Sequence, residues 1–277
     1  MLNKRIIICS TIKDEEKNLK NFFNKIDQIV SKFKDYFLIF VESDSSDGSI
    51  RLLNEYIKKR KGKVIIKKLK NKKNRIIRIE ISRNQYLQYI RNNKKLTKFD
   101  YLLIMDADGV NNRIDYRNLE DSIKKKNWNA IFANQSFFYY DVYALRIKNF
   151  INENFIHKIK SDIKNKTVLN LKNIIYENLT KFFYLNRKFN QRYIKVKSAF
   201  GGFGIYKLNK ILKFKYNSFS GQQCEHVKFN EDIYNKYGGL FIDKNLINSH
   251  GINKHTINGY LCSKSNFFAK RFISKIQ

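Results

Sequence analysis

The sequence contains the segment Asp100-Tyr101-Leu102-Leu103-Ile104-Met105-Asp106-Ala107-Asp108-Gly109. Its five consecutive apolar residues, 101–105, predict a strand that is buried on both faces of a sheet. The strand ends in two carboxylates, Asp106 and Asp108, which are one residue apart. Because alternate residues of an extended chain point the same way, both carboxylates can reach one divalent cation. An acidic turn after a core strand is the alternative interpretation.

The first hundred residues alternate short apolar runs with amphipathic segments. This alternation is typical of repeated βα units that feed a mainly parallel sheet. We predict strands over residues 5–9, 36–41 and 64–69, and helices over 50–57 and 82–92. Asp14 is expected to cap a first helix, since apolar residues between Leu19 and Phe33 recur at helical spacing. The predicted fold class is therefore α/β, with a mainly parallel sheet flanked by helices.

The alternation weakens after residue 110. Strands are predicted over 130–133, 142–145, 193–198 and 204–206, and a helix over 227–237 that ends at Gly238. Residues 147–192 are polar and predict a helical insertion. With 277 residues and no recognisable linker, the chain is expected to form a single domain, 1–277.

The composition is strongly basic, with 56 Lys and Arg against 24 Asp and Glu and a formal net charge of +32. Such a charge favours nucleic acid, an anionic membrane face or an acidic substrate as a partner. The basic runs at 58–73 and 124–126, however, lack the interleaved glycines and aromatics of a single-strand binding platform. Abundant Lys, Asn and Ile without proline is also what an A/T-rich genome produces. We therefore expect no nucleic-acid partner, and only a weak attraction to phosphorylated or membrane-bound acceptors.

Three cysteines, Cys9, Cys224 and Cys262, are too few for a disulfide framework and lack the paired spacing of a zinc site. The apolar run at 6–8 is too short for a signal peptide, and no segment approaches the roughly 20 apolar residues of a membrane span. We expect a cytoplasmic protein that is soluble or held peripherally at the membrane face by its basic surface.

Polar residues 42–49 follow the second predicted strand. Glu42 leaves the strand first, and its carboxylate can accept hydrogen bonds from a pyrimidine base or a ribose hydroxyl. Asp47 is better explained as the N-cap of the next helix. Arg83 and Asn84 are expected to open the third helix, where an arginine can bind a phosphate beside the helix N-terminus. An ordinary surface arginine is the alternative.

The segment Gln223-Cys224-Glu225-His226 precedes the last predicted helix. Glu225 or His226 can take a proton from an attacking hydroxyl, with helix capping as the alternative role. His250 and His255 are two of only four histidines, and either can complete a metal site or be an inert loop residue.

The order of these features resembles that of the inverting glycosyltransferases of the GT-A fold, broadly the family-two type. Residues 11–19 stand where that family opens its nucleotide pocket, and Glu42 stands at the position of its base-binding acid. Asp106-Ala107-Asp108 matches its metal motif. The similarity covers most of the chain except residues 147–192.

A looser similarity points to capsule-associated mannosyltransferase-like proteins, through the pairs Glu42-Ser43, Arg78-Ile79 and Arg83-Asn84. Residues 140–146 and 198–206 look like the sugar-facing and acceptor-facing strands of the wider group. The family usually places Glu-Asp where this chain has Glu225-His226, so the base is one of these two residues, with Glu225 preferred.

The resemblance implies a GT-A domain with a nucleotide-binding half, 1–110, and an acceptor-binding half, 111–277, that holds the helical insertion. It implies inverting transfer from a nucleotide-sugar donor to a glycan or lipid-linked acceptor, in polysaccharide biosynthesis, with Mn²⁺ or Mg²⁺ as cofactor. The implied catalytic residues are Glu225 and His226, and the implied metal ligands are Asp106, Asp108 and His250. The implied nucleotide and donor contacts are Thr11, Lys13, Glu15, Glu42, Arg83, Asp106, Asp141, Gly201 and Gly202.

Three other functions compete with this interpretation. A nucleotidyltransferase on a related sheet would need a glycine-rich, basic phosphate loop after the first strand, and residues 10–16 contain none. A basic RNA-binding protein would show tight binding with a steep salt dependence. A binding module without catalytic activity is the third alternative.

Overall fold

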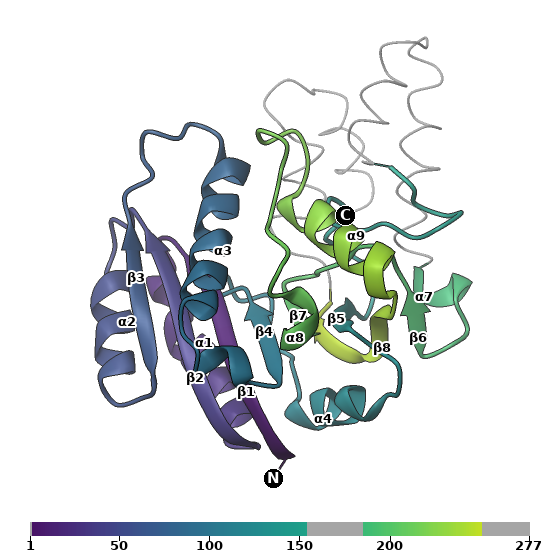
Figure 1. Cartoon of the computed structure of the whole chain (residues 1–277), viewed down its shortest axis with the longest axis horizontal. Helices are drawn as coiled ribbons and strands as arrows, with labels where there is room; N and C mark the ends of the chain where they lie inside the picture. The colour runs from purple at the N-terminus through teal and green to yellow at the C-terminus, as the bar shows by residue number, and fades with distance from the viewer. Residues whose placement is uncertain (1, 154–184, 251–277) are drawn as a thin grey trace, which may run out of the picture.

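The predicted strand at 101–105 lies in the middle of an eight-stranded sheet in the computed structural model, which describes residues 2–153 and 185–250 (Figure 1). The strand order is β3-β2-β1-β4-β7-β5-β8-β6. Strands β1, β2, β3 and β4 run parallel, as do β5 and β8, whereas β7 and β6 pair antiparallel with their neighbours. The prediction of an α/β fold with a mainly parallel sheet is confirmed.

The described strands are β1 (Leu2–Ile12), β2 (Phe33–Ser43), β3 (Gly62–Lys67), β4 (Tyr101–Met105), β5 (Ala130–Gln135), β6 (Tyr193–Lys195), β7 (Phe203–Lys207) and β8 (Leu240–Ser249). The described helices are α1 (Glu16–Val30), α2 (Ser49–Lys58), α3 (Arg75–Arg91), the 3₁₀-helix η1 (Leu96–Lys98), α4 (Tyr116–Lys124), α7 (Leu185–Lys188), α8 (Leu208–Ile211) and α9 (Glu225–Tyr237).

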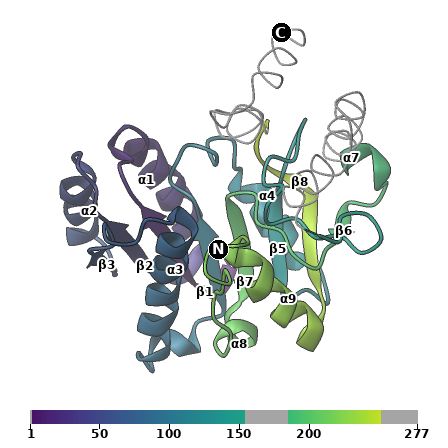
Figure 2. The ribbon, with the colours of Figure 1, turned by 90° about the horizontal axis from the view of Figure 1, so that it is seen from above.

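Two hydrophobic cores lie on opposite faces of the sheet. Because side chains alternate along a strand, Ile6 and Ile8 of β1 enter one core, and Ile7 and Cys9 enter the other. Helices α1 and α4 cover the first face, and α3, α8 and α9 cover the second (Figure 2). The continuous apolar runs of β1 and β4 are thus explained by burial on both sides.

The loops that precede α1 and α2 cap each other's helices. The carboxylate of Asp47 accepts a hydrogen bond from the Glu16 amide (2.9 Å), and the carboxylate of Glu16 accepts one from the Gly48 amide (2.9 Å). The prediction that Asp14 caps α1 is wrong, because Asp14 has a positive φ of 53° and its carboxylate accepts from the Ser46 amide instead. Asp47 was predicted to be the N-cap of α2, but the N-cap is Gly48. Asp47 lies one residue earlier, and its carboxylate accepts a hydrogen bond from the Ser49 amide at the start of the helix.

A tight turn at Gly201 and Gly202 leads into β7 and packs against the end of β4. Both glycines have positive φ values, 63° and 79°. A Cβ at Gly202 would lie 2.4 Å from Cγ1 of Val110, so no side chain fits there. The Gly202 carbonyl accepts a hydrogen bond from the Asp106 amide at 2.9 Å. The turn therefore fixes the backbone where β4 ends.

Several predicted elements differ from the structure. Strand β6 ends at Lys195, three residues before the predicted end at 198. Helix α3 begins at Arg75, seven residues before the predicted start at 82, because Asn74 provides the N-cap. Residues 142–144 form a turn, not a strand. Within the predicted insertion 147–192, Ile147 and Ile151 form an isolated bridge that closes a turn, and α7 is short. Residues 154–184, His255 and Cys262 lie outside the described residues.

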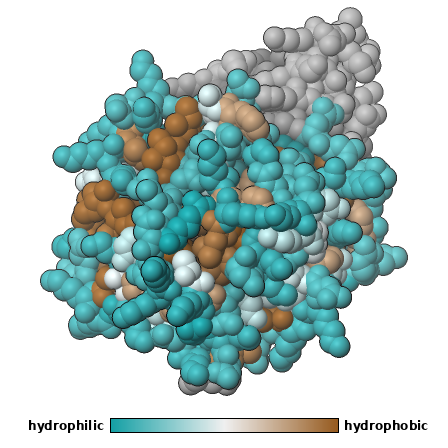
Figure 3. All heavy atoms as spheres, viewed as in Figure 1, coloured by the Kyte–Doolittle hydropathy of each residue, from teal (hydrophilic) through white to brown (hydrophobic). Residues whose placement is uncertain are grey.

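Hydrophilic residues cover most of the face shown in Figure 3, with only small apolar patches between them. Across residues 2–153 and 185–250, no helix combines the length and the apolar character that crossing a membrane requires.

Candidate active site

A cleft with a volume of about 270 Å³ opens at the C-terminal end of β4. Strands β2 and β3 lie on one side of β1, and β4 lies on the other, so the strand order reverses between β1 and β4. Open α/β sheets bind ligands at such a reversal, beyond the carboxyl ends of the strands. The cleft is lined by Arg75, Ile76, Ile79, Arg83, Asp106, Asp108, Tyr140, Asp141, Tyr143, Phe200, Cys224, Glu225 and His226.

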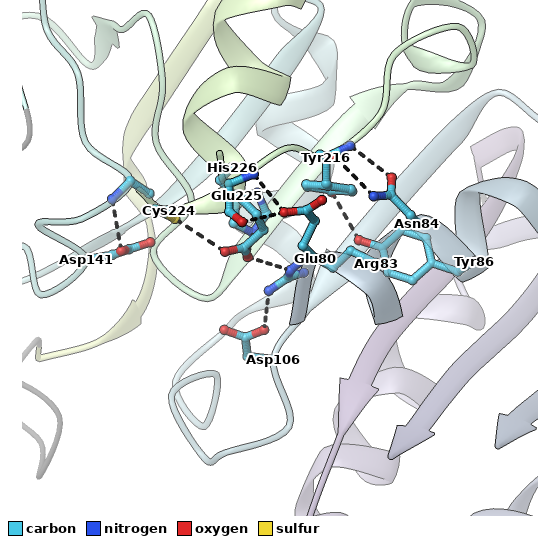
Figure 4. Close-up of polar contacts among 12 residues, drawn as sticks. Glu80, Arg83, Asn84, Tyr86, Asp106, Asp141, Tyr216, Cys224, Glu225 and His226 are labelled. Atoms are coloured by element: carbon cyan, nitrogen blue, oxygen red, sulfur yellow. Dashed lines mark hydrogen bonds and ion pairs between the residues drawn. The ribbon is translucent and has the colours of Figure 1, made fainter. Parts of the chain in front are cut away.

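Arg83 joins the two halves of the chain at the floor of the cleft (Figure 4). Its Nε donates to Oε1 of Glu225 at 2.9 Å, and its Nη2 donates to Oδ1 of Asp106 at 3.2 Å. The guanidinium carbon lies 4.8 Å from the ring centroid of Phe200. Only 4% of Arg83 is exposed, and its Nη1 has no hydrogen-bond partner among the described residues.

The prediction that Arg83 and Asn84 open the third helix is wrong. Helix α3 already begins at Arg75, so both residues lie within the helix, and Arg83 does not act at its N-terminus. Asn84 instead bonds the backbone of Tyr216: its Nδ2 donates to the carbonyl and its Oδ1 accepts from the amide. This pair ties α3 to the segment before α9.

Four carboxylates share the cleft with this single buried arginine. Asp106 and Asp108 follow β4, Asp141 comes from the loop after β5, and Glu225 is the first residue of α9. Burial raises the pKa of Asp106; Arg83 partly offsets this rise, whereas Asp108 and Asp141 add to it. Burial also raises the pKa of Asp141 to about 6. The cleft therefore has an excess of negative charge that a cation would neutralise.

Asp141 is held against the glycine turn. Its Oδ2 accepts from the Gly201 amide at 3.0 Å, and its Oδ1 accepts from the Ala144 amide at 3.3 Å. The structure thus brings together the predicted donor-side residues Asp141, Gly201 and Gly202 beside Asp106.

Glu225 and His226 lie side by side at the start of α9. The Glu225 carboxylate is held by Arg83 on Oε1 and receives a long contact from Sγ of Cys224, at 3.8 Å, on Oε2. His226 stacks on Phe200 with ring centroids 3.9 Å apart. Burial and the nearby Arg83 lower the pKa of His226 well below its usual value, so the imidazole is neutral. Neither of its ring nitrogens has a hydrogen-bond partner in the described parts of the chain.

The four residues predicted to recognise the nucleotide lie at the ends of β1 and β2 but do not line this cleft. Thr11 pairs with Val41 across the two strands. Lys13 donates to the Asp44 carbonyl at 2.8 Å, and Glu15 accepts from Asn18 at 2.7 Å. Glu42 is fully buried; its Oε1 accepts from the Ser45 amide, and its Oε2 has no partner among the described residues.

His250 lies apart from the carboxylates that line the cleft. Its Nδ1 is 2.7 Å from Oγ of Ser136, and its Nε2 contacts Nη1 of Arg113. Within the described ranges, no three His, Cys, Asp or Glu side chains are arranged to hold a metal ion by themselves. Of the predicted metal ligands, only Asp106 and Asp108 line the cleft.

Several lining residues were missed by the sequence analysis, notably Arg75, Ile76 and Ile79 of α3. Together with Arg83 they recur at helical spacing and form one face of the helix. This periodicity could have been recognised had the helix start been placed at Arg75. Tyr140, Tyr143 and Phe200 lie in the segments 140–146 and 198–206 that the resemblance pointed to, and Cys224 lies directly before Glu225, but none of the four was predicted as a site residue.

We predict that Arg83→Met costs about 3–5 kcal/mol of unfolding free energy, because it leaves Asp106 and Glu225 without their cation. Urea unfolding at neutral pH measures the loss. Arg51→Met is the matched control, since Arg51 pairs with Glu55 at the exposed surface and should contribute about 0–1 kcal/mol. Equal losses in the two variants would contradict the role assigned to Arg83.

We also predict a pH effect at Asp141. Its folded pKa of about 6 exceeds the roughly 3.9 of an unfolded aspartate, so between these values the folded chain binds more protons. Its contribution to stability is fully present below about pH 4 and is lost as the pH rises through about 6. The free energy of unfolding of Asp141→Asn should therefore fall less than that of the wild type over this window. The control Asp121→Asn, on α4, should keep the wild-type slope; an unchanged slope in Asp141→Asn refutes the assignment.

Comparison with solved structures shows a shared fold. The chain is similar to the mannosyltransferase PcManGT from Pyrobaculum calidifontis, solved in complex with GDP-Man and Mn²⁺, with 9% identity and a TM-score of 0.53. The match covers 95% of this chain and 60% of that one. It is also similar to S. aureus TarS, with 10% identity and a TM-score of 0.50, over 93% of this chain and 38% of that one. The chain thus spans less than two thirds of either protein's length.

No curated protein sequence matches the chain. The sequence profile of glycosyl transferase family 2, however, matches residues 6–195, which is more than half of the chain. The predicted GT-A architecture is confirmed by this match together with the mixed sheet and its flanking helices. The chain belongs to glycosyl transferase family 2.

Proposed function

We propose that this chain is a metal-dependent, inverting glycosyltransferase that moves a sugar from a nucleotide-sugar donor to a glycan or lipid-linked acceptor. The observation that carries the proposal is the convergence of Asp106, Asp108 and Glu225 from distant parts of the sequence in one cleft. Family membership and the sheet reversal beside this cleft support it. PcManGT was solved with a nucleotide sugar and Mn²⁺, which is consistent with the same ligand classes here.

The residues of the cleft fit a hard divalent cation shared with a diphosphate. Asp106 and Asp108 supply carboxylate oxygens, the ligand type that Mg²⁺ and Mn²⁺ prefer. Among the described residues, too few protein ligands converge to enclose the ion, so phosphate oxygens would complete its coordination. His250 stays a predicted further ligand, although in this conformation it contacts Ser136 and Arg113. When bound, the ion would neutralise the charge that develops on the departing diphosphate.

Glu225 is the proposed general base. Arg83 holds one of its oxygens, so the carboxylate keeps a fixed orientation at the floor of the cleft. Glu225 takes the proton of the acceptor hydroxyl while that oxygen forms a bond to the anomeric carbon. The bond from this carbon to the diphosphate oxygen breaks on the opposite face, and the nucleoside diphosphate leaves with the electron pair. One displacement therefore inverts the anomeric centre.

In this proposal His226 contacts the sugar. Its imidazole is neutral, and neither ring nitrogen makes a hydrogen bond within the described residues. Because both nitrogens are buried, the cleft wall must shift before one of them can bond a sugar hydroxyl. His226 is the partner of Glu225 at the cleft wall, and the alternative base if the glutamate proves dispensable.

The other residues proposed to contact the donor lie in the loops and turns near the strand ends. Asp141 and the turn at Gly201 and Gly202 would border the donor sugar. Thr11, Lys13, Glu15 and Glu42 would recognise the nucleoside beyond β1 and β2. Because Glu42 is fully buried, the loop at 44–47 must shift before its free oxygen can meet a base.

A donor screen tests the proposal directly. Several nucleotide sugars are incubated with and without Mn²⁺, and release of the nucleoside diphosphate is followed, since hydrolysis without an acceptor already identifies the donor. With that donor, Glu225→Gln should slow transfer by roughly 10²–10⁴-fold, because the amide cannot take the proton. Glu231→Gln on the same helix is the control and should leave the rate unchanged. Full activity of Glu225→Gln would assign the base to His226 or to another group.

The metal assignment predicts that Asp108→Asn stays folded and loses roughly 100-fold or more of its metal-dependent turnover. Thermal unfolding verifies the fold, and titration of turnover with Mn²⁺ measures the defect. Asp35→Asn, at the opposite end of β2, provides the comparison. If Asp108→Asn retains the wild-type response to Mn²⁺, Asp108 is not a metal ligand.

A further inference from the structure

A strongly basic loop borders the mouth of the cleft. This basic loop, residues 67–75, connects β3 to α3. Six of its nine residues are cations and none is acidic: Lys67, Lys68, Lys70, Lys72, Lys73 and Arg75. All of these except Lys67 are exposed. None forms an ion pair among the described residues, whereas Arg60 and Lys61 at the opposite end of β3 pair with Asp27 and Asp35.

Hydrogen bonds and burial fix the backbone of the basic loop, although its charged side chains form no ion pair with the described residues. Leu69 is buried, and its amide donates to Oδ2 of Asp44 at 2.7 Å. The carbonyl of Lys72 accepts from Arg78 at 2.9 Å, and the side chain of Asn74 caps α3. The lysines therefore project from a backbone whose position beside the cleft is defined.

The cations are arranged unfavourably unless an anion is bound. Lys72, Lys73 and Arg75 lie around the N-terminus of α3, where the helix dipole is already positive, and the first turn contains no acidic residue. Like charges gathered at this end repel each other as well as the dipole. An anionic group placed among them would relieve both effects.

The basic loop continues into the cleft along one face of α3. Arg75, Ile76 and Ile79 line the mouth, and Arg83 of the same face lies at the floor. Eight residues separate Arg75 from Arg83, which corresponds to about 12 Å along the helix axis. The cleft is thus basic at its mouth and acidic at its floor, where Asp106, Asp108 and Glu225 lie. Figure 4 shows Asp106 and Glu225 in contact with Arg83.

One diphosphate cannot occupy both ends, because it spans only a few ångström. In the proposed reaction the donor diphosphate lies at the floor beside Asp106 and Asp108, and the acceptor hydroxyl meets Glu225 there. The mouth is left for another part of the acceptor. We propose that the acceptor bears a phosphate group, bound by Arg75 and the lysines of the basic loop at the mouth of the cleft, away from the reacting hydroxyl at its floor. This assignment rests on the proposed transferase function and narrows its acceptor class.

Phosphate binding tests the assignment without catalysis. Calorimetric titration with inorganic phosphate at low ionic strength compares the wild type with the triple variant Lys72→Gln, Lys73→Gln, Arg75→Gln. The matched control is Lys58→Gln, Lys59→Gln, Lys63→Gln, which removes three exposed cations near the start of β3, at the opposite end of this strand from the basic loop, that form no ion pair with the described residues. We expect roughly tenfold weaker binding in the first variant and a change within about twofold in the control, because only the first loses clustered donors. Circular dichroism confirms that both variants fold.

Two further arms identify the source of the phosphate. The titration is repeated with excess UDP or GDP and Mg²⁺, and undiminished phosphate binding separates the mouth from the donor site. Co-sedimentation with phosphatidylglycerol vesicles, against phosphatidylcholine vesicles, then distinguishes the two sources. Binding that depends on the basic loop assigns the phosphate to a lipid headgroup, and its absence assigns it to a soluble phosphorylated acceptor.

Three results would overturn the assignment: no phosphate binding by the wild type, equal weakening in the two triple variants, or competition by the nucleoside diphosphate. Because the titration uses no sugar donor and no turnover, its failure leaves the transferase proposal standing. A failed donor screen, conversely, leaves the measured phosphate affinity unaffected.

Discussion

The arrangement of this cleft depends on one buried cation. Arg83 projects from α3 in the first half of the chain and meets Glu225, which begins α9 more than a hundred residues later. It also meets Asp106 at the end of β4. Burying a guanidinium and two carboxylates is tolerated only when they satisfy one another, so the three elements are confined to one mutual geometry. The floor of the cleft is therefore set by electrostatics as much as by the packing of the sheet.

The sheet itself provides the second constraint. Antiparallel β7 lies between β4 and β5, and the glycine turn that precedes it reaches back to the Asp106 amide. Asp141 then binds the same turn from the loop beyond β5. Backbone amides and carbonyls of this turn, not side-chain contacts alone, thus hold Asp106 and Asp141 in the same cleft.

The parts of this fold that could be predicted from sequence are those where burial restricts which residue types are tolerated. Strand β4 extends over the predicted residues 101–105, because a run buried on both faces has sharp ends. The start of α3 was missed, since the polar and basic residues before Ile76 give no apolar period. The apolar run at 142–145 was assigned to a strand by propensity, yet the carboxylate of Asp141 binds the Ala144 amide and holds the segment in a turn.

The site could be predicted only in part, for a similar reason. The order of motifs indicated that Asp106, Asp108 and Glu225 would meet, because strand ends and helix starts share one edge of an α/β sheet. Position along the chain could not show that Arg83 lies between Asp106 and Glu225, since that pairing depends on how α3 and α9 pack. Nor could it show that His250 contacts Arg113 and Ser136, or that Glu42 is closed beneath its own loop.

The reciprocal caps between the first two loops have a consequence for any attempt to alter the proposed nucleotide specificity of this protein. Glu16 and Asp47 each satisfy the helix that the other's loop begins, and a Cβ at Gly48 would lie 2.1 Å from Oε1 of Glu16. The two segments therefore behave as one structural unit at the proposed nucleoside end of the sheet. If a single loop were replaced by that of a relative with a different base preference, each of these two hydrogen bonds would lose one of its partners. A change of nucleotide therefore requires both segments to be exchanged together.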